Sequence, residues 1–215
     1  MSGREIRLPA PKAVKGLKFG ILKNVAMENV VDLPKKAFES AIDKLKEAGA
    51  SISEMFVSSV DEAMDLTGLL YSPEAYATWK HKIEKTPDLM FAKILERFRS
   101  GANVLASDFI CAWDKLMDLR QQYHSVVKMY DAVLIPTSPI IPPELDRLMN
   151  DGDFYNSQNL LALRNTRIGN LMGGCSITLP TDIPSCGLLI MGMPSQEERL
   201  LRLAQACELV LSRNQ

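Results

Sequence analysis

The sequence predicts an α/β fold in which a mixed, mainly parallel β-sheet is covered by helices. Residues 17–57 have the pattern of a strand, a helix and a second strand, which favours a parallel crossover unit. Residues 130–208 alternate two or three apolar, strand-like runs with helices and with polar loops that contain glycine and proline. Because ligands bind where strands end in open α/β sheets, we expect the functional site in this last third of the chain.

The composition is that of an ordinary globular protein, with 47% hydrophobic residues, 24% charged residues and a formal net charge of -1 over 215 residues. This balance predicts no binding to nucleic acid or to a membrane, and no apolar run reaches the roughly 18 residues of a membrane span. The four cysteines form no C-x-x-C pair and no secretory signal follows Met1, so we expect reduced thiols in a cytoplasmic protein. Residues 1–15 are expected to be an arm or linker, and residues 16–215 one domain.

The first expected strand covers residues 17–22, which alternate apolar and polar side chains and then run apolar. A helix follows, with Asp32 as its cap and Pro34 in its first turn. Gly49 is placed to end that helix in the left-handed conformation. Residues 51–57 alternate as a second strand.

Residues 59–130 are expected to be helical. Ser59 and Glu62 fit a capping box, and Pro73 and Pro87 each follow a capping residue. The longest helix is expected over residues 107–130, because its apolar residues form one stripe at helical spacing. That stripe consists of Phe109, Ala112, Trp113, Leu116, Tyr123, Val126, Val127 and Tyr130. The basic residues of this region, Arg97 among them, are interpreted as solvated helix faces.

A strand over residues 132–135 is followed by residues 136–156, whose prolines predict a long surface loop. Residues 159–171 are expected to be helical, and residues 176–179 and 187–191 to be strands. A second capping box at Ser195 begins the final helix. That helix is expected to bury Leu200, Leu203, Ala204, Cys207 and either Val210 or Leu211.

No complete catalytic apparatus is visible in the residues. His81 and His124, the two histidines, lie in helical stretches without a neighbouring motif, which disfavours both a Ser–His–Asp triad and a metal site. Gly173 and Gly174 belong to no phosphate-binding motif and are interpreted as close backbone packing or a helix end. The cysteines lie in apolar or glycine-rich segments and are interpreted as structural thiols. We therefore predict no cofactor, no metal ion and no catalytic residue in this chain.

Arg164 and Arg167 flank Asn165 on an expected helix that follows the long loop. A spacing of three residues places the two guanidinium groups on neighbouring faces, where they can fork a carboxylate or a carbonyl. The alternative is a solvated or ion-paired helix face. The residues alone leave both interpretations open.

Several segments resemble the amidase-signature family. Residues 130–139 (YDAVLIPTSP) are similar to its "YD-apolar-TPT-x-P" segment, and residues 164–180 resemble its "T-x-x-x-N-apolar-x-G-x-P-apolar-S-apolar-P" region. In the latter, Gly173, Gly174 and Cys175 replace the glycine and proline, a variant associated with the branch near allophanate hydrolase. Residues 14–21, 183–192 and 195–208 are similar to its "LKGLRIGV", "LP-x-GLQLIG" and closing-helix segments. Each motif is weak alone, but their shared order over residues 14–210 is fairly specific.

The resemblance implies an amidohydrolase that cleaves a C–N amide bond through an acyl-serine. In that family a Ser–Ser–Lys triad and a Gly/Ser-rich loop precede the "LKGLRIGV" strand, and no segment here is similar to them. The resemblance therefore implies the C-terminal portion of the domain, which supplies pocket wall and scaffold and is inactive by itself. The expected substrate-binding residues are Thr137, Arg164, Asn165, Arg167 and Asn170.

A separated half of a sheet leaves an open edge and an uncovered apolar face. We therefore expect the chain to bind the N-terminal half of the amidase domain or to self-associate, and the whole enzyme to bind a small amide. The rival interpretation is a non-catalytic binding or scaffold protein that retains half of the amidase fold. The sequence names no substrate, although Arg164 and Arg167 favour an acidic or urea-like group.

Overall fold

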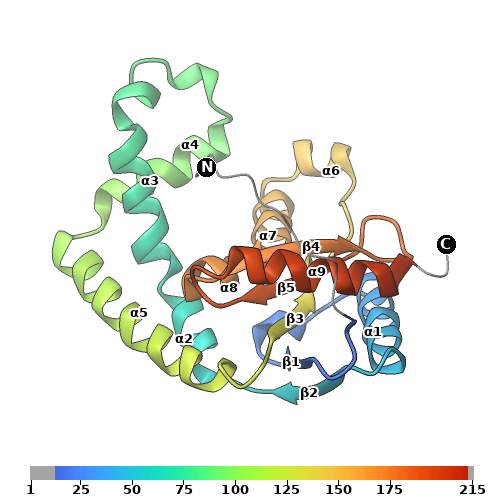
Figure 1. Ribbon diagram of the computed structural model, residues 1–215. Helices are drawn as coiled ribbons and strands as arrows, with labels where there is room; N and C mark the ends of the chain where they lie inside the picture. Colours follow the sequence, from blue (N-terminus) through green and yellow to red (C-terminus); the bar gives the residue numbers. More distant parts are fainter. Residues whose placement is uncertain (1–12, 213–215) are drawn as a thin grey trace.

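A five-stranded sheet lies at the centre of the computed structural model, which describes residues 13–212 (Figure 1). Its strands are β1 (Lys18–Leu22), β2 (Ser51–Met55), β3 (Ala132–Pro136), β4 (Cys175–Pro180) and β5 (Gly187–Gly192), in the order β2-β1-β3-β5-β4. β1 pairs in parallel with β2 and β3, whereas β5 runs antiparallel to β3 and β4. All strands except β5 thus share one direction, which confirms the predicted mixed sheet.

Helices surround this sheet and also extend beyond it (Figure 1). The α-helices are α1 (Asp32–Glu47), α2 (Ser58–Asp65), α3 (Thr67–Ile83), α4 (Ala92–Ser100), α5 (Ala106–Val127), α6 (Leu145–Asn150), α7 (Gly152–Ala162), α8 (Arg164–Met172) and α9 (Glu197–Leu211). Short 3₁₀ turns are η1 (Val25–Met27), η2 (Pro87–Leu89) and η3 (Gly101–Asn103). Helices α3 and α4 extend away from the sheet in Figure 1, with α5 running back towards it.

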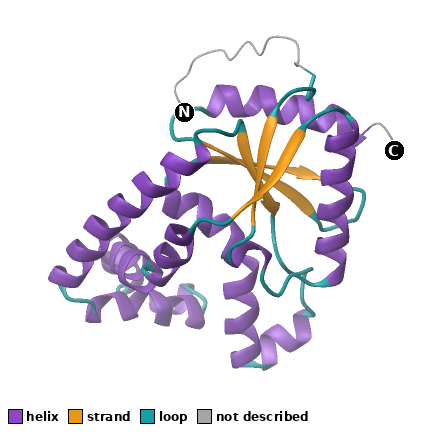
Figure 2. Cartoon of the chain, turned by 90° about the horizontal axis from the view of Figure 1, so that it is seen from below, coloured by secondary structure: helices purple, strands orange, loops and turns teal. Residues whose placement is uncertain are grey.

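Apolar side chains pack on both faces of the sheet, so helices flank it on two sides (Figure 2). One core joins the sheet to α2, α5 and α8, and the other joins it to α1 and α9. The central strand β3 is buried along its whole length. A continuous apolar run such as Ala132–Pro136 is what a strand covered on both faces requires.

The β1–α1–β2 unit follows the predicted pattern. Gly49 ends α1 with a φ of +93°, a conformation that costs glycine little because it has no Cβ. Pro34 lies in the first turn of α1, as expected. The expected cap is wrong: Val31 precedes the helix in extended conformation, Asp32 is the first helical residue, and no side chain of the described residues caps this end.

The capping box predicted at Ser59 is also wrong. α2 begins at Ser58 without a side-chain cap from residues 13–212, and the Ser59 hydroxyl is buried with no hydrogen-bond partner in that range. The acidic residue nearby has a different role, because Asp61 accepts hydrogen bonds from the side chain of Asn24 (2.7 Å) and from the backbone N–H of Val25 (3.2 Å). The same segment is therefore fixed by a long-range contact to the end of β1 and not by a local cap.

Other expected helix boundaries in this region had mixed outcomes. Pro73 lies inside α3, so Ser72 does not begin a helix, whereas Pro87 begins η2 as expected. The longest helix is confirmed as α5. Its buried residues are Ala112, Leu116, Leu119, Tyr123 and Val127, while Val126 of the expected stripe is exposed.

The long loop predicted after β3 is partly wrong, because α6 and the first half of α7 lie within it. Asp151 caps α7 by accepting a hydrogen bond from the Phe154 N–H at 2.9 Å. The helix expected over residues 159–171 is two helices, which meet at Leu163. Ser195 has a φ of +59° and does not cap α9; the expected buried residues of α9, with Leu211 as the last of them, are confirmed.

The expected arm comprises residues 1–15, of which residues 1–12 lie outside the described residues. Val14 is described and is buried in the core that includes Phe19 and Leu45. Between residues 13 and 212, no helix has the length and apolar character needed to cross a membrane.

Candidate functional site

Helix α8 begins beside the carboxyl ends of β1 and β3, where Asn165 holds it. The Asn165 side chain is fully buried. Its Nδ2 donates to the carbonyl of Ala26, just after β1, at 3.0 Å and to that of Pro136, the last residue of β3, at 2.7 Å. One amide group therefore joins three segments that are far apart in the sequence.

Arg164 strengthens the same junction and is only 7% exposed. Its Nη2 donates to the carbonyl of Glu28 at 2.7 Å and to that of Ala26 at 3.4 Å, and its Nε donates to Asn165 Oδ1 at 3.2 Å. Burial lowers the pKa of Arg164, and the nearby Glu28 carboxylate acts in the opposite direction. The guanidinium thus binds carbonyl groups of its own chain.

The opposite side of α8 lines a pocket of about 410 Å³, which we call the arginine pocket. It is formed by three groups of residues: Thr67, Gly68, Tyr71, Ser72 and Ala75 of α3; Arg97, Phe98 and Ser100 of α4; and Leu160, Leu163, Thr166, Arg167 and Asn170 from α7, α8 and their junction. Because about 3.6 residues make a helical turn, Arg167 and Asn170 face this pocket while Asn165 and Ile168 face the core.

Two arginines meet at this pocket without a carboxylate partner. No ion pair among residues 13–212 includes Arg97 or Arg167. Arg97 donates from Nη1 to Asn159 Oδ1 at 2.7 Å. The pKa of Arg167 is lowered chiefly by burial, Tyr71 acts to raise it, and the positive charge of Arg97 lowers it further. The wall is therefore a partly desolvated site of positive charge.

Tyr71 adds a phenol to the wall of the arginine pocket. Burial raises the pKa of its phenol, although Arg167 and Arg120 act to lower it. The phenol therefore stays protonated at neutral pH and can donate a hydrogen bond. Phe98, Leu160 and Leu163 supply apolar wall beside these groups.

Thr137 lies elsewhere, at the end of β3. Its hydroxyl donates to Thr178 Oγ1 of β4 at 3.2 Å, and its backbone N–H donates to the carbonyl of Gly187 at 2.9 Å. A Cβ built on Gly187 would lie 2.7 Å from Thr137 Oγ1, so glycine is needed for this close approach.

The five residues predicted to bind substrate therefore lie in three places. Arg167 and Asn170 line the arginine pocket. Arg164 and Asn165 lie on the side of α8 that contacts the strand ends, and they donate hydrogen bonds to backbone carbonyls. Thr137 contacts β4 and β5.

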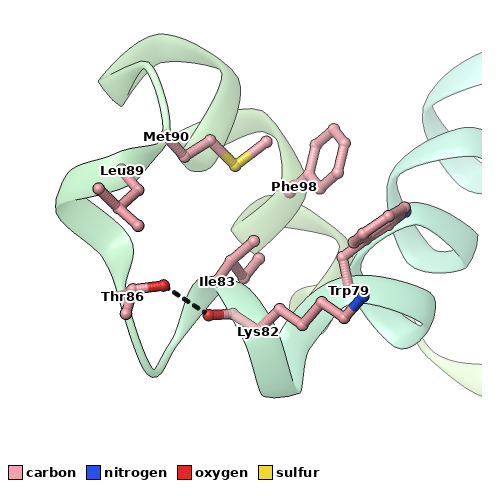
Figure 3. A pocket seen from close by; sticks show the side chains of 7 residues that line it. All are labelled: Trp79, Lys82, Ile83, Thr86, Leu89, Met90 and Phe98. Atoms are coloured by element: carbon pink, nitrogen blue, oxygen red, sulfur yellow. Dashed lines mark hydrogen bonds between the residues drawn. The ribbon is translucent and has the colours of Figure 1, made fainter.

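A second hollow, of about 470 Å³, lies between the end of α3 and α4 (Figure 3). Phe98 lines both hollows. Lys82 is the charged side chain of this second wall, and its Nζ lies 5.0 Å from the centroid of the Trp79 ring. The other lining side chains are Ile83, Thr86, Leu89 and Met90, and Thr86 Oγ1 donates to the Lys82 carbonyl at 3.3 Å. An apolar wall with one stacked cation offers no acid–base pair for catalysis.

The remaining candidate groups have structural surroundings. Over residues 13–212, no three His, Cys, Asp or Glu side chains are grouped to hold a metal ion. His124 Nε2 lies 3.0 Å from the carbonyl of Met172, at the end of α8. All four cysteines are free thiols, and burial raises the pKa of Cys207 to about 12, which makes it a poor nucleophile.

Both interpretations of the paired glycines are confirmed. Gly173 ends α8 with a φ of +68°, in the left-handed conformation that glycine tolerates. At Gly174, an added Cβ would lie 2.5 Å from the carbonyl oxygen of Gly192.

Tyr71 and Arg97 are pocket residues that the sequence did not indicate. Arg97 was expected on a solvated helix face, but it is only partly exposed and lines the pocket. Arg97 and Arg167 line one pocket although they are 70 residues apart in the sequence, and no local pattern encodes this arrangement. The one sequence signal is that Arg97 lies between the apolar residues Leu95 and Phe98, whereas Arg99 pairs with Glu84.

Curated relatives match nearly the whole chain. An amidase from Pseudomonas putida is 28% identical over 92% of this chain and 43% of its own length. A 2-amino-5-chloromuconic acid deaminase from Comamonas testosteroni is 27% identical over 94% of this chain and 45% of its own length. The chain thus spans less than half the length of these two relatives.

Solved structures share the fold at lower identity. Allophanate hydrolase from Kluyveromyces lactis superposes with a TM-score of 0.79 at 19% identity, covering 98% of this chain and 35% of that one. A 6-aminohexanoate cyclic dimer hydrolase superposes with a TM-score of 0.76 at 18% identity, covering 94% of this chain and 46% of that one. The sequence profile of the family named Amidase matches residues 2–201. The chain therefore belongs to the amidase family.

Proposed function

We propose that this chain forms the pocket wall and scaffold of an amidohydrolase that cleaves a C–N amide bond. The observation that carries the proposal is the family match over residues 2–201 together with the arginine pocket beside α8. In this proposal Arg167 and Asn170 contact the substrate. Arg164 and Asn165 position α8 without touching the substrate, and Thr137 holds β4 and β5 at the end of β3.

The chemistry assigned to the whole enzyme is acyl transfer to a serine. A nucleophilic serine attacks the amide carbonyl, its proton passes through a bridging serine and a lysine, and the C–N bond breaks as the nitrogen is protonated. Water then attacks the acyl-serine, which releases the acid. We assign the Ser–Ser–Lys triad and the amides that bind the oxyanion to an N-terminal amidase segment beyond these residues.

The proposal includes a partner for this chain, which is either that N-terminal amidase segment or a second copy. β4 and β2 are the edge strands of the sheet, and an edge with unpaired backbone groups is suited to further pairing. We also propose a cytoplasmic location, because four free thiols are typical of proteins in a reducing compartment.

The test is release of ammonia from a panel of simple amides and allophanate. The chain is assayed alone and after co-expression with an N-terminal amidase segment from the same locus or from a relative. We expect turnover in the mixture and none in the pure chain. Turnover by the pure 215-residue chain would overturn the assignment of the triad to another segment. If both parts fold and associate but release no ammonia, the chain is a non-catalytic scaffold instead.

A further inference from the structure

We propose that the amide substrate also carries a carboxylate, and that Arg97 and Arg167 of the arginine pocket bind it. The inference rests on the proposed function, because it names the substrate class of the same pocket. It assigns the arginine pocket to recognition of the substrate's anionic end, at a distance from the bond that breaks.

The first argument is the charge that the pocket leaves unbalanced. Arg97 and Arg167 line one pocket and lack a carboxylate within ion-pair distance among the described residues. Like charges in a partly desolvated wall repel each other, and an anion between them removes this repulsion. By contrast, Arg99, two residues from Arg97, is neutralised by Glu84 at 2.7 Å.

The second argument is the number of free donors. Each guanidinium has five N–H donors in a planar fork that matches a carboxylate. Arg97 uses Nη1 to bind Asn159, and the Arg167 side chain has no hydrogen-bond acceptor within the described part of the chain. Tyr71 and Asn170 add a phenol and an amide to the same wall. These groups can complete the hydrogen bonds of a carboxylate.

The third argument is the shape and character of the remaining wall. Phe98, Leu160, Leu163 and Ala75 form an apolar surface next to the two arginines. A volume of about 410 Å³ is larger than a bare carboxylate needs. The wall therefore suits a molecule with an apolar body and one anionic end, and it disfavours a small inorganic anion that would leave this surface wet.

Binding to the full 215-residue chain tests this inference without any turnover. The probe is hippurate, which has an apolar ring, an amide and a carboxylate, and its matched neutral control is hippuramide. We expect titration calorimetry to show at least tenfold tighter binding of hippurate, since hydrogen bonds to a charged group are stronger than those to a neutral amide. Inorganic phosphate is the third ligand, and it should bind more weakly than hippurate.

Three variants that each remove one positive charge test whether the preference for hippurate comes from the arginines of the pocket. Arg97→Gln and Arg167→Gln should each weaken hippurate binding about tenfold or more, while hippuramide binding should stay unchanged. Arg202→Gln, on α9 across the sheet, removes one positive charge outside the pocket and should leave both affinities unchanged. Arg167→Lys keeps the charge but not the fork, and should recover only part of the affinity. Circular dichroism and thermal melting of each variant establish that it is folded.

The outcomes separate this inference from the proposed function. Equal affinity for hippurate and hippuramide, no binding of hippurate, or an equal loss in Arg202→Gln would overturn the carboxylate assignment even if the reconstituted enzyme hydrolyses amides. Tighter binding of phosphate than of hippurate would also overturn it. If the affinities follow the expectation but the reconstituted protein has no turnover, the pocket assignment stands and the proposed function fails.

Discussion

Asn165 provides a sharp test of how the pocket wall is held in place. Its Nδ2 makes two buried hydrogen bonds, to the carbonyls of Ala26 and Pro136. Asn165→Ala removes both donors and leaves two buried carbonyls with fewer partners. A buried polar group without its partner costs about 1–3 kcal/mol. Ala26 keeps a longer bond from Arg164, at 3.4 Å, which offsets part of the loss. The expected destabilisation is about 2–4 kcal/mol.

Asn170→Ala is the matched control, because it makes the same chemical change in the same helix. Asn170 is exposed, and its side chain has no hydrogen bond within residues 13–212. Both variants gain the same helix propensity of alanine, about 0.5 kcal/mol, so their difference isolates the buried hydrogen bonds. Urea unfolding followed by tryptophan fluorescence measures this difference, and thermal unfolding should differ by about 5–15 °C.

The reasoning would be refuted if the two variants differed by less than about 0.5 kcal/mol, the range of ordinary surface substitutions. Such a result would mean that water or a small backbone shift replaces the lost donors. A second check is the arginine pocket: if Asn165 positions α8, Asn165→Ala should also weaken hippurate binding. Asn165→Asp keeps the shape and the acceptor for Arg164 Nε but removes both donors, so it should also be destabilising.

Three further predictions concern stability. Gly174→Ala should lower the free energy of unfolding by about 1–3 kcal/mol, because the added methyl group clashes with the Gly192 carbonyl. Gly68→Ala is the control: its methyl group lies in open space on α3, and urea unfolding should show a gain of up to about 1 kcal/mol. Arg167→Met should raise the free energy of unfolding by up to about 1 kcal/mol, because it removes a half-buried cation that has no carboxylate partner among residues 13–212. A lower urea midpoint would contradict the electrostatic picture. Burial raises the pKa of Tyr123 above its ordinary 10.0, so the unfolded chain loses this proton at a lower pH than the folded chain, and stability should fall as the pH rises above 10. Thermal melting at several pH values should show a smaller fall for Tyr123→Phe, and an unchanged profile would contradict the prediction.

The regular elements were largely predictable because their signals are local. Gly49 and Gly173 end helices in the left-handed conformation, and the apolar run of β3 is buried throughout. Capping was not predictable in the same way. Ser59 and Ser195 have suitable sequence neighbours, yet Ser59 lies one residue inside its helix and Ser195 has a positive φ. In both cases the tertiary context sets the backbone conformation and overrides the local preference.

The candidate site was only partly predictable for a related reason. The sequence indicated α8, where Arg167 and Asn170 line the pocket. It did not distinguish Arg164 from Arg167, although Arg164 lies on the buried side of α8 and Arg167 lies in the pocket wall. That distinction depends on which side of α8 contacts the strand ends. Arg97 could not be identified, since its place depends on how α3 and α4 are positioned relative to α7 and α8, which lie far along the chain.

The division of α8 into two sides has a consequence for how such a protein can diverge. Substitutions at Arg167 or Asn170 alter the chemistry of the pocket wall and leave the junction of β1, β3 and α8 intact. Substitutions at Arg164 or Asn165 disturb that junction before they affect any ligand. A single short helix thus separates the positions where substitutions change only the pocket wall from those where the fold permits little variation.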